Sequence, residues 1–405
     1  MNWSNRKGMK WLMVVCALAL VVPLALAGCA KAPPPVEKPI VIGGSLPLTG
    51  IFADTGKVIK EGYDKWVEDI NAKGGLLGRP VKLILYDDTS SVEKAVTLLE
   101  KAITVDKVDL LLGGYPGTAC SAQMPIAEKY KMVYLSMGGH MHSFMQGYKY
   151  SFGPPPLMGE WWYEGFFEWL ESLPAKDRPK ICASFTMNNP IGTSLLDSIA
   201  NGCKRLGINL VINEKYDLPL ATAEPLVAKA KAANADLFFS NGFFDDGVLT
   251  VRAAKALGYN PAFYVQGVGN IIPAWVKELG SDGNYIFSST VMHNKLPYPG
   301  VKELNEWYTA EHRILAPTYF LFGYCWMEAL QRGVEGAGSL DQDAIKDYLR
   351  THEISTIGGK FTFDEKGLPP PFSIGTQILK GEVELIWPPD VQTAAPVYPK
   401  PAWGK

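Results

Sequence analysis

The feature that most constrains the fold is an alternation of short apolar runs with longer helical patterns, which begins at Ile40. The apolar runs have strand length and are rich in β-branched and aromatic residues. They are residues 40–43, 81–86, 109–113, 132–136, 180–185, 209–212, 236–240 and 262–266. Strand and helix in alternation are typical of parallel, doubly wound sheets with helices on both faces. The sequence therefore predicts an α/β fold.

Two of the predicted helices are marked at their ends. The first carries apolar side chains at helical spacing from Val58 to Ile70 and stops at a glycine pair, residues 74–75. The second opens with Ser90-x-x-Glu93, which predicts a capping box with Ser90 at the helix start. Prolines at 154–156 then interrupt the pattern, and a chain of 405 residues favours two domains with a boundary there.

Residues 1–28 are predicted to be an export signal rather than part of the fold. A basic start containing Arg6 precedes an apolar run at 11–24, which is too short for a membrane span, and residues 26–29 read Leu-Ala-Gly-Cys. The last four resemble a bacterial lipobox, which implies cleavage before Cys29 and lipidation of its thiol. An uncleaved anchor is the alternative. Residues 29–39 then form a proline-rich tether.

Several activities lack support in the sequence. Lys and Arg number 39 against 41 Asp and Glu, with no block of like charge, so nucleic-acid binding has no electrostatic basis. The glycines before Lys57 have the wrong spacing for a phosphate loop, and the pair His140 and His142 lacks the other ligands of a metal site. No nucleophile motif is present. We expect no cofactor, no metal and no catalysis.

The cysteines leave one question open. Cys182 falls on a predicted strand and Cys203 on the helix that follows it. In an oxidising compartment these two residues could form a disulfide, and two buried thiols fit the sequence equally well.

Small residues follow two of the predicted strands in the first half of the chain. After the strand at 109–113, residues 115–119 open a helix, so free backbone amides and the positive end of the helix dipole would face the end of the sheet. Such a site suits a carboxylate. Gly138 and His140 follow the next strand, where small residues let the backbone approach a ligand. Taken alone, these glycines fit tight turns equally well.

The order of motifs resembles the leucine/isoleucine/valine-binding family of type I periplasmic binding proteins. Residues 46–50 read Leu-Pro-Leu-Thr-Gly, residues 68–80 read Glu-Asp-Ile-Asn-Ala-Lys-Gly-Gly-Leu-Leu-Gly-Arg-Pro, residues 86–88 read Tyr-Asp-Asp, residues 253–259 read Ala-Ala-Lys-Ala-Leu-Gly-Tyr, and residues 266–269 read Gln-Gly-Val-Gly. The resemblance covers nearly all of the mature chain, and the stretch from 71 to 80 is the most specific part.

The resemblance implies two Rossmann-like, doubly wound parallel-sheet lobes joined by a three-crossing hinge that closes on ligand. It implies lobe 1 at 40–153 plus 269–355, lobe 2 at 154–268 plus 356–385, and a proline-rich tail at 386–405. In this family the segment matching residues 114–119 holds the ligand carboxylate, the segment matching 136–140 helps to hold an α-ammonium group, and a carboxylate of lobe 2 completes the ammonium site.

These roles transfer to particular residues. The carboxylate site is expected at Tyr115, Gly117, Thr118 and Ala119, and the ammonium side at Gly138 and His140. The lobe 2 carboxylate aligns best with Asp246 and next with Asp245. Gly117 stands at the usual serine and His140 at the usual hydroxyl residue, so carboxylate capture survives these changes better than α-amino recognition does.

Aromatic residues at loop positions are further candidates for ligand contacts. Phe52, Tyr115, Phe243 and Phe244 fall at loop positions that could face the ligand, whereas Trp161 and Trp162 fit helix packing better. Tyr115, within the carboxylate segment, is the strongest aromatic candidate.

The expected function is that of an extracytoplasmic, lipid-anchored substrate-binding protein of an ABC importer. Its ligand would be a small carboxylate, either an amino acid or an aryl or short-chain acid, and its partners would be permease and ATPase subunits. A sensor subunit of the amide-binding type is the alternative. The chain is expected to be a monomer, held in the periplasm of a Gram-negative host or on the cell surface of a Gram-positive one.

Overall fold

The protein is built on two main β-sheets within residues 40–405. The structure is a computed structural model that describes residues 38–136, 141–155, 161–267, 269–270 and 273–404. A three-stranded sheet with the order β2-β1-β3 forms the centre of lobe 1, and a seven-stranded sheet with the order β14-β13-β10-β9-β8-β6-β7 forms the centre of lobe 2. The predicted α/β class with doubly wound, mostly parallel sheets is confirmed.

Lobe 1 is centred on a parallel sheet. Strand β1 (Ile40–Leu46) pairs with β2 (Val81–Asp87) along its whole length and with the short β3 (Leu110–Leu111) on its other side. A separate parallel pair consists of β4 (Tyr134–Leu135) and β5 (Ser151–Phe152). Side chains alternate along β1, since Ile40 and Ile42 join one apolar cluster and Val41 packs on the other.

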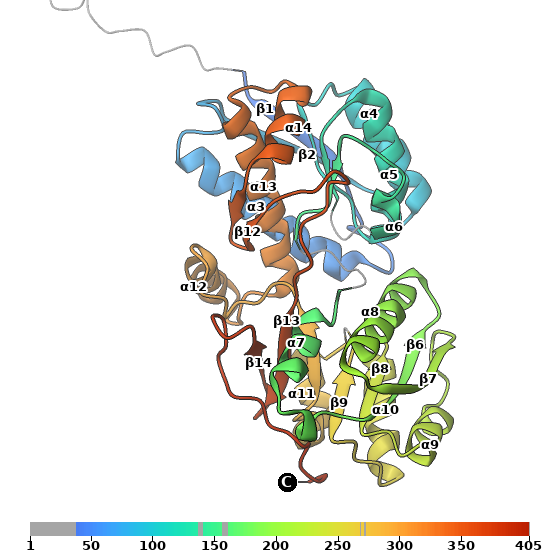
Figure 1. Ribbon diagram of the computed structural model, residues 1–405. Helices are drawn as coiled ribbons and strands as arrows, with labels where there is room; N and C mark the ends of the chain where they lie inside the picture. The colour runs from blue at the N-terminus through green and yellow to red at the C-terminus, as the bar shows by residue number, and fades with distance from the viewer. Residues whose placement is uncertain (1–37, 137–140, 156–160, 268, 271–272, 405) are drawn as a thin grey trace, which may run out of the picture. The chain divides into compact units, whose positions relative to one another are not determined.

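Helices cover both faces of this sheet (Figure 1). One cluster contains residues of α3 (Ala53–Ala72), α13 (Thr318–Ala337) and α14 (Gln342–Thr351), and the other contains residues of α4 (Val92–Thr104) and α5 (Gly117–Tyr130). Helices α3 and α13 approach closely at two glycines. A Cβ on Gly62 would lie 2.3 Å from the Phe320 carbonyl oxygen, and one on Gly323 would lie 2.4 Å from that of Ile59.

The predicted first helix is confirmed, and the start of the second differs by one residue. Ser91, not Ser90, is the N-cap of α4, and its hydroxyl accepts the Lys94 N–H at 3.3 Å. Ser90 instead joins two loops, because its hydroxyl donates to the Thr49 carbonyl at 2.9 Å and accepts the Phe52 N–H at 3.1 Å. The Ser90 hydroxyl, which the sequence motif assigned to the helix cap, is therefore used in contacts with another loop.

Lobe 2 has a larger sheet whose two faces bury different clusters. Its parallel strands are β6 (Ile181–Met187), β7 (Asn209–Tyr216), β8 (Leu237–Asn241), β9 (Phe263–Gln266) and β10 (Phe287–Thr290). One face packs against α7 (Glu164–Ser172) and α8 (Pro190–Leu206). The other packs against α9 (Glu224–Ala232), α10 (Phe244–Ala256) and α11 (Pro273–Leu279).

The chain passes three times between the two sheets, but two boundaries differ from expectation. Residues 273–290, expected in lobe 1, contain α11 and β10, and β10 joins the lobe 2 sheet. Its sequence, Phe-Ser-Ser-Thr, has no apolar run, so the pattern did not reveal a strand. The hairpin of β11 (Ile354–Thr356) and β12 (Gly359–Phe361) packs with the lobe 1 cluster, although residues from 356 onward were expected in lobe 2.

The last part of the chain completes lobe 2. Strands β13 (Ile374–Leu379) and β14 (Glu382–Trp387) add an antiparallel pair to one edge of the sheet. The predicted proline-rich tail follows without regular structure and bonds to the lobe, for example from Lys400 N to the Ala262 carbonyl at 2.8 Å. The remaining helix, α12 (Val301–His312), packs on the lobe 1 cluster.

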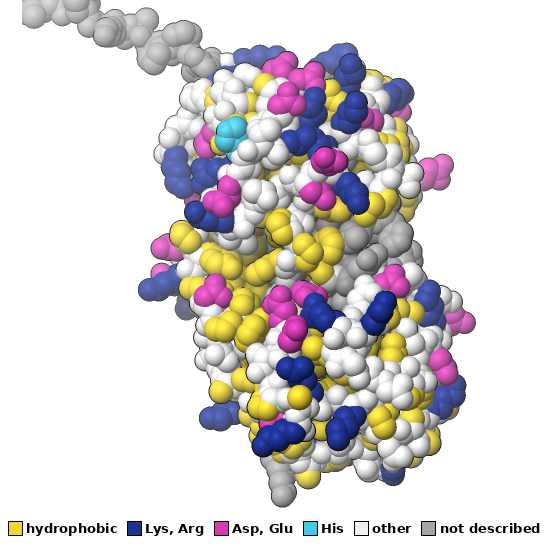
Figure 2. Space-filling view, viewed as in Figure 1, with side chains coloured by type: hydrophobic (Ala, Val, Ile, Leu, Met, Phe, Trp, Pro, Cys, Tyr) yellow, Lys and Arg dark blue, Asp and Glu magenta, His cyan; other side chains and the backbone are white. Residues whose placement is uncertain are grey.

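The visible surface carries charges of both signs. Figure 2 shows basic and acidic side chains interspersed over both lobes on the face in view, with hydrophobic side chains gathered across the middle of that face. In the described residues, no helix is both long and apolar enough to cross a membrane, and no group of three or more His, Cys, Asp or Glu could hold a metal ion.

Candidate ligand-binding site

The first turn of α5 presents backbone donors at the end of the lobe 1 sheet. Strand β3 ends three residues before Gly114, and α5 starts at Gly117 with no acidic residue in its first turn and no side-chain cap. The N–H groups of Ala119 and Cys120 donate to the Pro116 carbonyl at 2.9 and 3.1 Å. Among the described residues, the N–H groups of Gly117 and Thr118 have no acceptor, so this turn retains free donors at the positive end of the helix dipole.

Thr118 adds a hydroxyl group to the same turn. Its side chain is exposed, and within the described part of the chain the hydroxyl makes no hydrogen bond. A hydroxyl beside two free amides can complete the coordination of a carboxylate. Gly117 and Ala119 on either side are buried and small, so no side chain of theirs blocks the turn.

A buried network fixes the loop that leads into α5. The Gly114 N–H donates to the Tyr134 hydroxyl at 3.0 Å, and that hydroxyl donates to Gln123 Oε1 at 2.6 Å. Gln123 Nε2 in turn donates to the Ala95 carbonyl at 2.9 Å, and the Cys120 thiol donates to the Gly114 carbonyl at 2.8 Å. Burial raises the pKa of the Tyr134 hydroxyl well above its ordinary value, so it stays protonated and keeps its donor.

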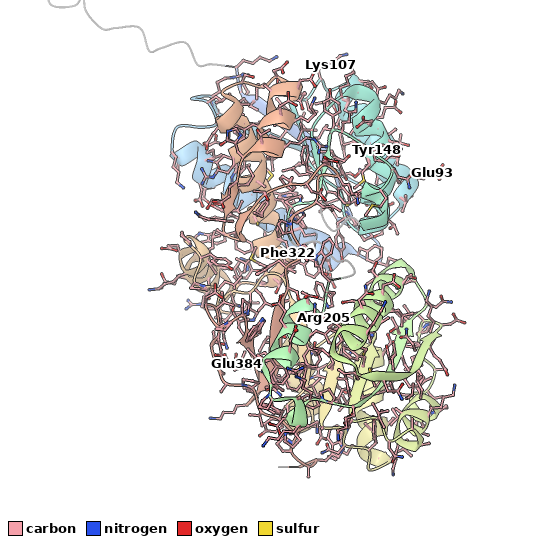
Figure 3. The ribbon with its side chains drawn as sticks, viewed as in Figure 1. Glu93, Lys107, Tyr148, Arg205, Phe322 and Glu384 are labelled. Atoms are coloured by element: carbon pink, nitrogen blue, oxygen red, sulfur yellow. The ribbon has the colours of Figure 1, made fainter. Side chains whose placement is uncertain are left out.

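Four aromatic side chains beside this loop form a row in which each ring contacts the next. The ring centroids of Phe52 and Tyr115 are 6.0 Å apart, those of Tyr115 and Tyr319 are 5.7 Å apart, and those of Tyr319 and Phe322 are 5.4 Å apart. All three contacts are edge-to-face, the arrangement favoured by aromatic quadrupoles. We call these four residues the aromatic wall. All four are half-buried, and Phe322, labelled in Figure 3, packs on the apolar clusters of both lobes.

The aromatic wall also carries hydroxyl groups. The Tyr115 hydroxyl donates to that of Tyr319 across 3.5 Å. Burial raises the pKa of Tyr115 well above its ordinary value, and Tyr319 adds to the rise, whereas a hydrogen bond with Thr55 acts in the opposite direction. Both phenols are therefore neutral polar groups in an otherwise apolar wall. Sequence reasoning identified Phe52 and Tyr115 but missed Tyr319 and Phe322, whose i, i+3 spacing near the start of α13 was the available signal.

The two adjacent aspartates of α10 have different roles: one stabilises the fold, and the other is exposed and free to contact a ligand. Asp246 is buried, and its two carboxylate oxygens accept the N–H groups of Leu220 at 3.0 Å and Phe243 at 3.1 Å. Asp246 therefore ties the start of α10 to a neighbouring loop. Asp245 is exposed, and among the described residues it has no hydrogen-bond or ion-pair partner. The structure thus leaves Asp245, the second choice from the sequence, as the carboxylate that could meet a ligand.

Some polar side-chain atoms after strand β9 are buried. Gln266 Oε1 and both side-chain polar atoms of Asn270 make no hydrogen bond within the described part of the chain. Gln266 Nε2 donates to the Gly242 carbonyl at 3.3 Å, which places this side chain beside the start of α10. Phe243, expected near the ligand, is 45% exposed at the same helix start, and Phe244 is half-buried.

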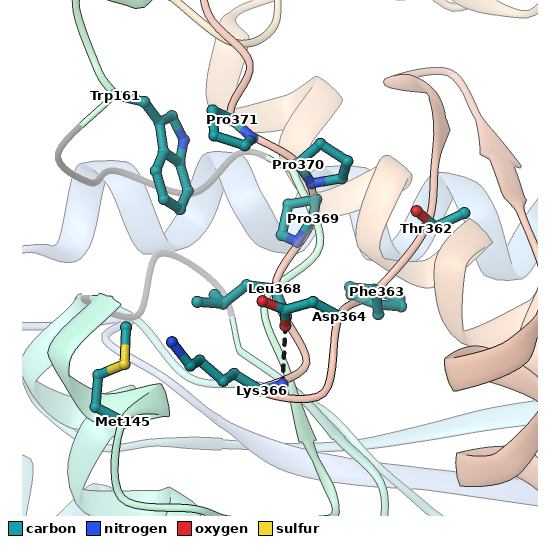
Figure 4. A pocket seen from close by; sticks show the side chains of 10 residues that line it. All are labelled: Met145, Trp161, Thr362, Phe363, Asp364, Lys366, Leu368, Pro369, Pro370 and Pro371. Atoms are coloured by element: carbon teal, nitrogen blue, oxygen red, sulfur yellow. Dashed lines mark hydrogen bonds between the residues drawn. The ribbon is translucent and has the colours of Figure 1, made fainter.

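The two neighbouring tryptophans have different surroundings. Trp162 is buried in the lobe 2 cluster, which confirms packing as its role. Trp161 is half-buried and lines a pocket of about 340 Å³ together with Met145 and residues of the third passage between the sheets (Figure 4). That passage supplies Lys366 and the three prolines at 369–371. Gly138, His140 and the lipidation residue Cys29 lie outside the described residues.

Comparisons with known proteins agree with this architecture. Residues 39–370 match the family model of the periplasmic binding proteins. The leucine-, isoleucine-, valine-, threonine- and alanine-binding protein of Pseudomonas aeruginosa is 23% identical over 353 residues, which cover 86% of this chain and 91% of that protein.

Two solved structures show the same fold. A leucine-binding protein from Thermotoga maritima superimposes with a TM-score of 0.72 at 22% identity, covering 86% of this chain and 98% of that one. An ABC transporter solute-binding protein from Rhodopseudomonas palustris, in complex with 3,4-dihydroxybenzoic acid, gives a TM-score of 0.70 at 18% identity, covering 86% and 95%. The match over residues 39–370 shows that the chain belongs to the periplasmic binding protein family, and the resemblance to its leucine/isoleucine/valine-binding members is confirmed.

Proposed function

We propose that this protein is the substrate-binding subunit of an ABC importer and that it captures a small carboxylate by closing its two lobes around the ligand. Cys29 carries the lipid that holds it at the outer side of a membrane, and a permease and an ATPase are its partners. The protein acts as a monomer and performs no chemistry on the ligand.

The observation that carries the proposal is the first turn of α5. Gly117 and Thr118 offer two backbone donors and one hydroxyl at a helix start that has no acidic residue. A carboxylate there would receive charge-assisted hydrogen bonds and a favourable helix dipole. Among the strand-end helix starts whose N-caps the structure describes, α3 and α10 have an acidic first turn and α4 and α8 have a side-chain cap, whereas α5 has neither.

The aromatic wall supplies the rest of the lobe 1 surface for the ligand. Phe52, Tyr115 and Tyr319 would contact an apolar or aryl group attached to the carboxylate, and the phenols could bond to a ring hydroxyl. The Rhodopseudomonas palustris protein holds an aryl acid of this kind, and the Pseudomonas aeruginosa protein is named for aliphatic amino acids. Gly138 and His140 would complete the site from the same lobe.

Asp245 sets the choice between these two ligand classes. An amino acid needs a carboxylate for its α-ammonium group, and Asp246 is occupied by two backbone donors. If the ligand has an α-amino group, Asp245 binds it; if the ligand is an aryl acid, Asp245 makes no contact with it.

The experiment is isothermal titration of the chain starting at Ala30 with leucine, isoleucine, benzoate and dihydroxybenzoate, repeated on Thr118→Val. Loss of one charge-assisted hydrogen bond of about 1.5–3 kcal/mol should raise Kd by at least about ten-fold for every ligand that binds. Thr97→Val on α4 is the matched control, since among the described residues that hydroxyl donates to the carbonyl of Glu93 on its own helix and to no ligand-site residue. Tight carboxylate binding that Thr118→Val leaves unchanged would refute the α5 site.

A further inference from the structure

Two cysteines of lobe 2 lie in the apolar layer between the sheet and α8. Cys182 lies on β6 and Cys203 lies on the last turns of α8. Both side chains belong to the cluster on the α7 and α8 face of the sheet, whereas Ala183, the next residue on β6, belongs to the opposite face. The strand therefore directs Cys182 toward the helix that carries Cys203.

The two thiols are neighbours and are shielded from solvent. Cys182 is 0% and Cys203 is 1% exposed, and both side chains belong to the same apolar cluster. Burial, together with this neighbour, raises the pKa of the Cys182 thiol well above its ordinary value. In the folded protein both sulfurs are therefore closed to reagents in the solvent.

The other two described cysteines have different partners. The Cys120 thiol donates to the Gly114 carbonyl at 2.8 Å, and Cys325 lies 3.3 Å from the Thr356 hydroxyl and 3.7 Å from the Pro155 carbonyl. These two sit in lobe 1 on α5 and α13, away from the pair on β6 and α8. Cys182 and Cys203 are thus the two described cysteines of lobe 2, and they lie on a strand and on the helix that packs against it.

We propose that Cys182 and Cys203 form a disulfide in the mature protein. Members of the periplasmic binding protein family act outside the cytoplasm, where thiol pairs are oxidised. In the reaction, the two thiols lose two protons and two electrons as the S–S bond forms, and an incoming protein disulfide accepts both and leaves as a dithiol. Because the folded lobe buries both sulfurs, the exchange takes place during folding, before α8 packs on the sheet.

The cross-link would close a covalent ring that contains the turn between β6 and α8. Between the two cysteines the chain runs along β6, turns at Asn189 and returns along α8. Asn189 caps α8 by accepting the Gly192 N–H at 2.8 Å. A bond between the far ends of β6 and α8 would keep this turn in place when the lobe opens locally. The disulfide would form whichever ligand the protein binds.

The test is to count thiols by mass spectrometry on the chain starting at Ala30, exported behind a leader whose cleavage does not need Cys29. The protein is unfolded in denaturant and alkylated with iodoacetamide, without reductant and then with it. The disulfide predicts two labels, on Cys120 and Cys325, before reduction and four after it. Four labels without reduction, on protein alkylated directly from the exporting cell, would overturn the proposal.

Matched variants separate the bond from its effect on stability. Cys203→Ala should give three labels with or without reductant, whereas Cys325→Ala should give one label before reduction and three after it. Reductant added in denaturant before refolding should lower the melting temperature of the native chain by on the order of 5 °C. The double variant Cys182→Ala/Cys203→Ala should show no such shift, and an equal shift in both would contradict a role for the bond.

Discussion

At the scale of single residues, adjacent positions on α10 have opposite roles. Asp246→Ala would leave the N–H groups of Leu220 and Phe243 without their acceptor, so we expect a loss of about 1–2 kcal/mol in the free energy of unfolding. Asp245→Ala should change stability by less than about 0.5 kcal/mol, because the side chain is exposed. Urea unfolding of the two variants measures both values.

The same pair reports on the ligand. If the ligand carries an α-ammonium group, Asp245→Ala should raise its Kd by about ten-fold or more, and it should leave the Kd of benzoate unchanged. Asp246→Ala, measured where it is still folded, should affect both ligands to a similar degree. A selective effect of Asp246→Ala on the amino acid would instead return the ammonium site to that residue.

Glu328 predicts a pH dependence of stability. Burial raises its pKa from 4.5 to about 7; the Ile357 N–H, Arg332 and Lys73 offset part of the rise, and Asp69 adds to it. Because the folded pKa exceeds the unfolded value, the folded state binds more protons in this window. The contribution of Glu328 to the free energy of unfolding is therefore fully present below pH 4.5. It is lost as the pH rises to about 7, by on the order of 3 kcal/mol.

Substitution at this position should remove the dependence. Glu328→Gln keeps an acceptor for Ile357 and has no charge to bury, so its free energy of unfolding should change less between pH 5 and pH 8 than that of the native chain. Glu335→Gln, an exposed position on the same helix, should keep the native slope. Parallel slopes in the native chain and Glu328→Gln would show that this carboxyl does not titrate in the window.

At the scale of elements, the sequence predicts most of the framework and part of the site. The helical spacing from Val58 to Ile70 gave α3, because buried side chains on one face dominate its pattern. Strand β10 was missed, since a short strand held by neighbours on both sides needs no apolar run. The role of Ser90 was missed for a similar reason, because its contacts with Thr49 and Phe52 come from another loop.

The site was predictable where local backbone determines it and not where distant elements meet. The first turn of α5 follows a strand directly in the chain, so its free donors could be inferred from residues 115–119. Tyr319 reaches Tyr115 from a helix more than 200 positions later. Likewise, only the packing of the loop containing Leu220 against α10 shows that Asp246 is occupied.

The proline-rich tail is expected to stabilise lobe 2. Gln377 exchanges two hydrogen bonds of 2.8 Å with the Val397 backbone, the Tyr398 ring stacks on Phe263, and Trp403 Nε1 donates to the Tyr259 carbonyl at 3.1 Å. Ending the chain at residue 395 should lower the free energy of unfolding by at least about 3 kcal/mol, since it exposes aromatic surface and leaves buried polar groups unpaired. Urea unfolding checks this, and Lys380→Ala, at an exposed turn, serves as a control.

At the scale of the whole molecule, three passages of chain between the sheets are the covalent basis for the proposed closure. A ligand shifts an opening equilibrium only as far as its affinities for the two states differ. A ligand held by the α5 turn in lobe 1 and also contacted by lobe 2 binds the closed state more tightly. Ligand binding and contraction should therefore have the same concentration dependence.

Small-angle X-ray scattering during ligand titration tests that coupling. We expect the radius of gyration to fall as the ligand saturates, with a midpoint equal to the calorimetric Kd. In Thr118→Val the full contraction should remain, but its midpoint should move up by the same factor as Kd, because the variant weakens binding without altering the passages. Binding heat without contraction would reject closure and leave the carboxylate site intact, whereas contraction in Thr118→Val at the native midpoint would separate closure from the α5 turn.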